Sequence, residues 1–307
     1  MRRMKANHLV AIGILFVGML AIALTSPQVH LKGSGAHAEA PEGLRPLRHS
    51  NTPSVLFLNV GKADCALVFL GKEIWMIDTG SKAAADAMLR TLDTFGVETL
   101  AGVFVTHTDK DHVGGLKPLL KSGVTVEHLY TPMLHTEKSD KDHPVYKAAQ
   151  KYQIPFTWLS AGDSLDAGEE ARFTVLGPIS LTPDSENNNS LVMLLDSPDG
   201  TILFTGDMEF LQEEELLRAG VIPKADVLKV AHHGEDDASS SALIGTVRPQ
   251  WAVISTNSQE EPDTPSPKVI KLLWAVDAGV AVTQDAAYGI LVTLSQGVAT
   301  AEAVSEP

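Results

Sequence analysis

The chain has 307 residues, of which 44% are hydrophobic, and this ordinary globular composition suffices for one large core or two small ones. A net charge of −14 works against broad binding to nucleic acid. The single cysteine, Cys65, excludes an internal disulfide bond.

Residues 1–26 predict an export signal. Three basic residues precede an uncharged run from Leu9 to Thr25, a pattern typical of a signal peptide or a signal anchor. The run is at the short end of bilayer-spanning lengths, and small-residue sites at 21–23 and 36–38 suit cleavage. Cleaved and retained forms both stay open. We expect an exported or membrane-anchored protein of a bacterial-type cell envelope, which touches the membrane only through this segment.

Residues 27–307 carry 21 basic and 38 acidic residues, a net charge of −17. Residues 27–53 predict a flexible spacer, residues 54–295 a domain of alternating strands and helices, and residues 296–307 a disordered tail. Two sheets covered by helices are the economical architecture. The expected strands are Val55–Val60, Ala66–Leu70, Ile74–Ile77, Gly102–Thr106, Val126–Tyr130, Phe156–Leu159, Ala171–Leu176, Ser190–Leu195, Thr201–Thr205, Asp226–Ala231, Trp251–Ser255, Val280–Thr283 and Gly289–Leu294. The expected helices are 83–95, 144–152, 208–219, 239–246 and Pro265–Ala278.

Four metal-ligating residue types occur within six positions after the Gly102–Thr106 strand. Side chains two apart in extended backbone point the same way, so His107 and Asp109 can face one ion. Asp111 and His112, at the turn into the next helix, can face a second ion. Imidazole suits zinc, and carboxylate also admits manganese. The alternative is a solvated loop that caps a helix, which this density of ligands disfavours.

Three further groups are candidates for the same site. Asp207 follows a strand and suits bridging of two ions, although it can instead cap the next helix. His232 and His233 also follow a strand, where the alternative is a surface position. Residues 186–190 offer amide groups to a substrate or ion, or form a plain turn.

Together these residues suit hydrolysis. Two ions lower the pKa of a shared water and stabilise charge that develops on the attacked atom. Asp111 or Asp207 can orient that water or accept its proton. The sequence contains no Gly-x-Ser-x-Gly elbow and no Walker-type phosphate loop.

The segment His107–His112 (HTDKDH) resembles the HxHxDH motif of the metallo-β-lactamase superfamily, with Asp109 where many members have a second His. That variant, together with Val55–Asp64 (VLFLNVGKAD) and Ala225–Gly234 (ADVLKVAHHG), is similar to the hydrolase domain of ComEC-type DNA-uptake proteins. The resemblance covers about residues 54–295. Its other blocks are Ile77–Gly80, Asn188–Leu195, Thr205–Met208 and Pro265–Pro267.

The resemblance implies a four-layer αββα sandwich, of α/β (α+β) class, with two divalent ions. Asn189 is expected to line the site. Members usually have Gly-His where this chain has Asp263 and Thr264, so one ion lacks a ligand unless Asp263 or a water replaces it. The implied metal ligands are His107, Asp109, Asp111, His112 and Asp207, with one or both of His232 and His233.

The first functional hypothesis is an extracytoplasmic phosphodiesterase, with nucleic acid among its candidate substrates despite the net charge. A second is a hydrolase of a small ester, lactam or thioester, because the same ions serve acyl transfer. A third is a catalytically degenerate binding or assembly protein on the same fold, which Thr264 favours. No protein partner is indicated.

Overall fold

A computed structural model describes residues 52–305 of the chain. The predicted export signal, residues 1–26, lies outside the described residues, as does the predicted spacer except for its last two positions. Within residues 52–305, no helix combines the length and the hydropathy that a membrane crossing requires.

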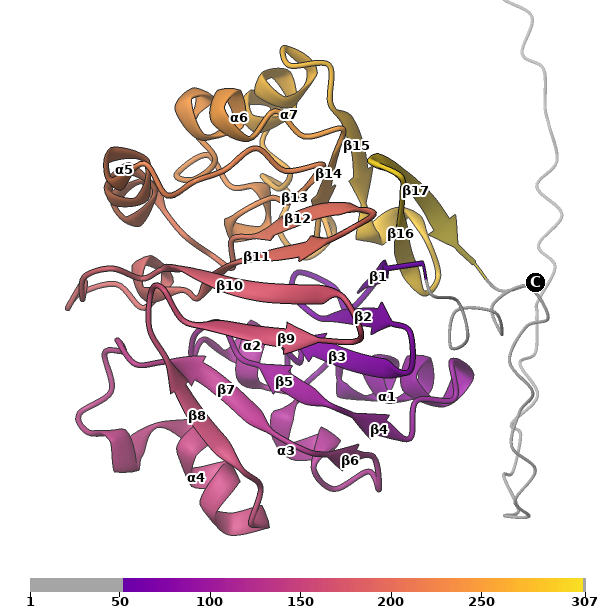
Figure 1. The fold of residues 1–307 in the computed structure, drawn as a ribbon, viewed down its shortest axis with the longest axis vertical. Helices are drawn as coiled ribbons and strands as arrows, with labels where there is room; N and C mark the ends of the chain where they lie inside the picture. Colours follow the sequence, from indigo (N-terminus) through magenta and orange to yellow (C-terminus); the bar gives the residue numbers. More distant parts are fainter. Residues whose placement is uncertain (1–51, 306–307) are drawn as a thin grey trace, which may run out of the picture. The chain divides into compact units, whose positions relative to one another are not determined.

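Two large sheets form the centre of the described domain (Figure 1). The eight-stranded sheet has the order β17 (Val298–Val304), β16 (Gly289–Ser295), β1 (Ser54–Leu58), β2 (Ala66–Leu70), β3 (Glu73–Ile77), β5 (Gly102–Phe104), β7 (Leu129–Pro132) and β8 (Phe156–Leu159). The seven-stranded sheet has the order β15 (Gly279–Val282), β14 (Trp251–Ile254), β13 (Val227–Lys229), β12 (Gly200–Phe204), β11 (Val192–Ser197), β10 (Ala171–Gly177) and β9 (Ser164–Ala167). Two short strands, β4 (Thr99–Leu100) and β6 (Thr125–Val126), pair apart from these sheets.

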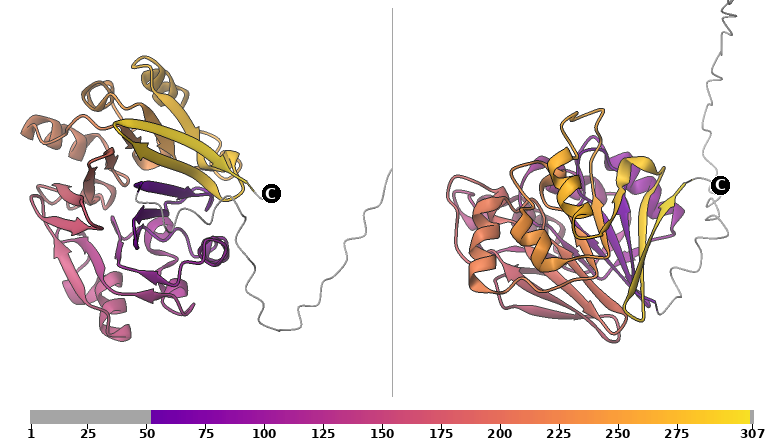
Figure 2. Two further views of the ribbon diagram at one scale, coloured as in Figure 1. Left: turned by 45° about the vertical axis from the view of Figure 1, so that its right-hand side comes forward. Right: turned by 90° about the horizontal axis from the view of Figure 1, so that it is seen from above.

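Helices cover the outer face of each sheet (Figures 1 and 2). On the eight-stranded sheet, α1 (Ala85–Thr94), α3 (Leu116–Leu119) and α4 (Pro144–Tyr152) share one apolar cluster with the strands. On the seven-stranded sheet, α5 (Phe210–Ala219), α6 (Ser241–Val247) and α7 (Pro267–Trp274) do the same. The short α2 (Lys110–Val113) follows β5. The predicted αββα sandwich is therefore confirmed.

The inner faces of both sheets meet in a third apolar cluster, which contains stacked Trp75 and Phe104 rings with centroids 5.6 Å apart. The packing of strand β1 explains why every residue of the strand after Ser54 is apolar. Val55 and Phe57 point into the cluster between the sheets, whereas Leu56 and Leu58 point toward the helices. A strand buried on both faces reads as a continuous hydrophobic run.

Each sheet contains a parallel segment, and this positions the functional loops. Strands β3, β5, β7 and β8 are parallel, as are β12, β13, β14 and β15. In open α/β sheets, ligands bind at the carboxyl ends of parallel strands. The candidate residues follow β5, β12 and β13, so they lie at such ends.

The expected strands and helices are largely present, and strands β2 and β8 and helix α4 have the predicted ends. The prediction of a disordered tail is wrong for Val298–Val304, which forms β17 and pairs with β16 along its whole length. Gln296 and Gly297 both have positive φ, which suits a tight hairpin turn. Strand β9 was not predicted, because its sequence, Ser-Leu-Asp-Ala, contains no apolar run.

Candidate metal centre

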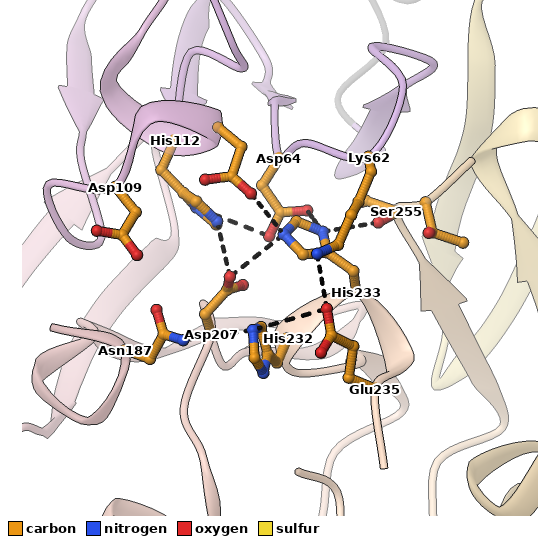
Figure 3. Close-up of polar contacts among 12 residues, drawn as sticks. Lys62, Asp64, Asp109, His112, Asn187, Asp207, His232, His233, Glu235 and Ser255 are labelled. Carbon is orange, nitrogen blue, oxygen red and sulfur yellow. Dashed lines mark hydrogen bonds and ion pairs between the residues drawn. The ribbon is translucent and has the colours of Figure 1, made fainter. Parts of the chain in front are cut away.

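Four side chains from three loops converge at the carboxyl ends of the parallel strands (Figure 3). Their ligand atoms all lie within 4.8 Å of one another. Asp207 Oδ2 lies 3.0 Å from His112 Nε2 and 3.2 Å from His233 Nε2. Asp111 Oδ2 also lies 3.2 Å from His233 Nε2, and its side chain is 31% exposed, which opens the group to solvent. We call Asp111, His112, Asp207 and His233 the four-residue cluster.

Asp78, at the end of β3, holds the loop that carries two of these residues. Its carboxylate accepts hydrogen bonds from Thr106 N at 2.7 Å and Thr106 Oγ1 at 2.8 Å. His112 Nδ1 lies 2.8 Å from Asp78 Oδ2. Asp78 is buried, so it fixes the backbone of the loop and turns His112 Nε2 toward the cluster.

The turn after α2 requires two consecutive glycines. A Cβ at Gly115 would lie 2.1 Å from the carbonyl oxygen of Thr79, and one at Gly114 would lie 2.3 Å from that of Lys110. Both contacts are with backbone, which cannot move aside. The pair therefore lets the loop of His112 pass close to the end of β3.

Consecutive residues His232 and His233 face different surroundings. Both have positive φ, 47° and 54°, a strained conformation for residues with a Cβ that is enriched at functional sites. His233 Nδ1 lies 2.9 Å from the carbonyl oxygen of Ser255, and its Nε2 faces the cluster. His232 Nδ1 instead lies 2.9 Å from Asp237, in a separate group with Glu209. Of the two histidines, only His233 lies in the four-residue cluster.

The predicted partners His107 and Asp109 lie beside the cluster. His107 is fully buried, and its ring centroid is 4.1 Å from that of His112. Its Nε2 is 3.8 Å from Asp109 Oδ2, whose side chain is 52% exposed. Neither belongs to a group of three ligand atoms within 4.8 Å among the described residues.

The polar atoms of the site fit a cation. Within the described residues, Nε2 of His107, His112 and His233 and Oδ1 of Asp207 are buried without a partner of hydrogen-bond geometry. Asp207 Oδ2 pairs with two of these nitrogens as a charged neighbour, at 3.0 Å from His112 Nε2 and 3.2 Å from His233 Nε2. The Nδ1 atom of each of these three histidines contacts another polar group of the protein, an arrangement typical of metal-ligating imidazoles. These Nδ1 contacts are Thr106 and Ser190 for His107, Asp78 for His112 and Ser255 for His233.

The charges of the cluster balance one another. Burial would lower the pKa of His233, but Asp207 and Asp111 raise it to about 10. The pKa of His112 is likewise raised well above its ordinary value by Asp207 and Asp78, despite burial. Burial and the nearby His112 lower the pKa of His107 to about 3. A cation would therefore compete with protons on His112 and His233.

A buried ion pair behind the cluster was not predicted from the sequence. Lys229 Nζ lies 2.7 Å from Asp64 Oδ2 and donates to the carbonyl oxygen of Val230 at 2.9 Å. Asp64 Oδ1 lies 3.8 Å from His233 Nδ1. A lone lysine within the apolar stretch of β13 is the signal for such a pair, because buried lysines are almost always paired.

The two residues expected to line the site differ in burial. Asn189 is fully buried, and its amide bonds both backbone groups of Thr182 and the carbonyl oxygen of Ser185. Asn189 thus closes a loop, and its expected place in the lining of the site stays a prediction. Asp263 is exposed, and its role stays a prediction. Thr264 is buried and bonds the carbonyl oxygen of Glu261.

Comparison with known proteins agrees with this geometry. The family model of the Metallo-beta-lactamase superfamily matches residues 58–255, more than half of the chain. The chain is similar to ComE operon protein 3 of Bacillus subtilis, with 33% identity over 178 residues, 58% of this chain and 23% of that protein. It is also similar to Recombination protein 2 of Haemophilus influenzae, with 31% identity over 204 residues, 65% of this chain and 24% of that protein. The chain thus spans about a quarter of the length of these relatives.

Solved structures share the fold. The metallo-beta-lactamase fold protein YhfI from Bacillus subtilis has a TM-score of 0.50 and 16% identity, covering 81% of this chain and 100% of that one. CmlA, a diiron beta-hydroxylase from Streptomyces venezuelae, has a TM-score of 0.51 and 11% identity, covering 80% and 55%. The fold of this family implies a divalent metal. The chain is also similar to Competence protein ComA of Neisseria gonorrhoeae, with 26% identity over 208 residues, 67% of this chain and 27% of that protein. The chain belongs to the metallo-beta-lactamase superfamily and is a metal-dependent hydrolase related to ComE operon protein 3, Recombination protein 2 and Competence protein ComA.

Proposed function

We propose that this chain hydrolyses phosphodiester bonds with a divalent ion held by the four-residue cluster. The observation that carries the proposal is the convergence of Asp111, His112, Asp207 and His233, with buried imidazole nitrogens that have no hydrogen-bond partner. A divalent ion held there would lower the pKa of water and stabilise the negative charge on the phosphoryl oxygens of the attacked group. Zinc suits this mixture of imidazoles and carboxylates, and manganese is the second choice.

We infer that a second ion binds more weakly, beside His107 and Asp109. His107 Nε2 has no hydrogen-bond partner, and the buried Asp207 is the carboxylate suited to bridging two ions. However, Asp109 is half-exposed, and the buried Thr264 supplies no imidazole at the position where the resemblance implies His. The second position therefore has fewer fixed protein ligands than the first.

We assign different roles to the two carboxylates of the four-residue cluster. Asp207 is buried, so we assign it to holding the ion. Asp111 reaches solvent with 31% of its side chain exposed, so it can also orient the attacking water and accept its proton.

His232, outside the four-residue cluster, is our candidate for the residue that moves a proton. Its Nδ1 lies 2.9 Å from Asp237 Oδ1, which orients the ring, and its ring centroid is 6.2 Å from that of His233. The side chain is 14% exposed. We propose that His232 supplies a proton to the leaving oxygen, which replaces the metal-binding role considered from the sequence.

The choice of phosphodiesters rests on the relatives, whose names refer to competence and recombination. Competence and recombination concern nucleic acids, whose backbone is a phosphodiester, and we carry over to this chain the type of bond and not the polymer. The basic flank and the apolar run of residues 1–26 support an extracytoplasmic place of action.

The test is hydrolysis by the full chain, stripped of metal and reloaded with zinc or manganese. We expect turnover of bis(p-nitrophenyl) phosphate that requires the added ion. Asp207→Ala should lower kcat by at least about a hundredfold, because it removes the carboxylate that lies beside both imidazoles and would hold the ion with them. Asp166→Ala is the control, because Asp166 is an exposed residue of β9 paired with Arg172.

Equal activity of Asp207→Ala and the wild-type chain would overturn the assignment of the site. Turnover of a chromogenic lactam or an aryl ester, with none of the phosphodiester, would replace the proposed substrate by an acyl compound. No turnover of any of them by the metal-loaded chain would favour a binding role.

A further inference from the structure

Lys62 stands in the turn between β1 and β2, at the edge of the metal centre. Its backbone N–H donates to Glu260 Oε2 at 3.1 Å. The preceding Gly61 has φ of 78°, and a Cβ there would lie 2.6 Å from Glu260 Oε1. The carboxylate of Glu260 therefore sits directly against this turn and fixes its backbone.

The side chain of Lys62 extends toward the cluster (Figure 3). Its Nζ lies 2.6 Å from Glu235 Oε1, and the two side chains are 22% and 29% exposed. Glu235 is two residues beyond His233. Burial would lower the pKa of Lys62, but Glu235 and the more distant Asp111 raise it. A charged ammonium thus reaches solvent beside the cluster.

The other lysine paired with a residue of this site cannot do the same. Lys229 is buried, and its ammonium is engaged by Asp64 and by the carbonyl oxygen of Val230. Among the ion pairs between described residues, Lys62 is the accessible lysine that pairs with a residue of the site's loops.

Carboxylates outnumber basic residues around the rest of the site, where the exposed Lys110 stands between Asp109 and Asp111. Glu186 accepts a hydrogen bond from Thr108 Oγ1, next to His107. Glu209 and Asp237 flank His232. Asp109, Glu235 and Glu260 also contact residues at the edge of the site, and Glu261 acts electrostatically on Lys62. Such a rim repels a polyanion along its length, whereas one compact anion can reach Lys62 and a bound cation together.

We propose that Lys62 binds the anionic oxygen of the substrate, and that the surrounding carboxylates restrict this substrate to a small phosphodiester and exclude a nucleic-acid strand. This inference rests on the proposed phosphodiesterase function. Glu235 holds the ammonium in place before the substrate binds, and the substrate oxygen then takes over one of its three N–H donors.

The first experiment measures binding of inorganic phosphate to the metal-loaded full chain by calorimetry. Lys62→Gln should weaken phosphate binding about tenfold to a hundredfold, the effect of one lost charge-assisted hydrogen bond. Lys147→Gln is the matched control, because Lys147 pairs with Asp142 at 3.4 Å on the exposed surface of α4. Unchanged phosphate binding in Lys62→Gln would overturn the proposal.

Glu235→Gln separates anion binding from a purely structural ion pair. If Lys62 binds the anion, freeing its ammonium should leave phosphate binding equal or tighter. If the pair is only structural, both variants should lower Tm and weaken phosphate binding alike, and this result would contradict the proposal.

The second experiment measures the anisotropy of a short labelled single-stranded DNA mixed with the metal-loaded chain. We expect negligible binding at low salt, because the rim is acidic. Tight binding that weakens as salt rises would overturn the restriction to small substrates. Phosphate binding at Lys62 without turnover of any phosphodiester would instead refute the proposed function and leave the anion site standing.

Discussion

The histidines of the metal centre are each oriented through Nδ1. Asp78 holds His112, and the carbonyl oxygen of Ser255 holds His233, so the Nε2 atoms are directed into the cluster. Fixed rings lose little freedom when they bind an ion, and the partner at Nδ1 also raises the basicity of the ligand. Residues that never touch the ion therefore contribute to its affinity.

His143 is a buried histidine outside the metal centre. It is fully buried, and neither of its ring nitrogens has a hydrogen-bond partner among the described residues. Its ring lies 4.9 Å from that of His135 and 5.0 Å from that of Trp158, measured between centroids. Burial, followed by the neighbouring His135, lowers its pKa from 6.5 to about 3.

His143→Phe should make the protein more resistant to acid. In the unfolded chain this histidine binds a proton below about pH 6.5, but in the fold only near pH 3, so acidification between these values favours unfolding. The loss is about 1.4 kcal/mol per pH unit, on the order of 2 kcal/mol at pH 5. Urea denaturation of both proteins at neutral and acid pH measures it. A constant difference in unfolding free energy across this range would contradict the assignment.

At the scale of elements, the turn after α2 packs closely against the backbone that follows β3. Gly115→Ala should reduce the unfolding free energy by about 1–3 kcal/mol or more, because the new methyl group meets the carbonyl oxygen of Thr79. Gly245→Ala is the control. Gly245 lies in α6 with open space around it, so alanine there should stabilise by about 0.5–1 kcal/mol. Equal thermal shifts for the two variants would count against the tight turn.

Strand β17 makes a second element-level prediction. Ala299 is buried between the sheets, whereas Thr300 on the same strand is exposed. Ala299→Glu should cost more than about 2 kcal/mol of unfolding free energy, because it buries a charge, and Thr300→Glu should cost little. Thermal unfolding compares them. If both substitutions were equally harmless, the segment would behave as the unstructured tail expected from the sequence.

The strands were predictable where burial is two-sided. The apolar runs of β1 and β2 identify them without knowledge of their neighbours. By contrast, β9 and β17 are edge strands with many exposed residues, and they are defined by pairing with β10 and β16. Pairing partners are a tertiary property, so a local pattern does not contain them.

At the scale of the whole molecule, the site assembles from distant segments. The spacing of ligands within residues 107–112 predicts metal binding from that segment alone. Asp207 and His233 are predicted to join the site because each follows a strand. The pattern does not distinguish His232 from His233, because the choice depends on φ angles and on the carbonyl oxygen of Ser255. Asp64 and Lys229 escaped prediction because their pairing joins segments 165 residues apart in sequence.

The acidic residues that give the chain its net charge of −14 include a group around the metal centre. Carboxylates gather around the metal centre, where they attract a divalent cation and repel an extended polyanion. A metal-loaded site neutralises part of this charge. The charge distribution therefore agrees with a metal-dependent enzyme for a compact substrate better than with a protein that holds long nucleic acid.

Anomalous diffraction from crystals of the metal-loaded protein tests the central claim most directly. We predict an ion about 2.0–2.2 Å from ligand atoms of Asp111, His112, Asp207 and His233. The same measurement on Asp207→Ala should show that ion weakened or lost. An ion bound only between Glu209, His232 and Asp237, or none bound near His112 and His233, would contradict the account.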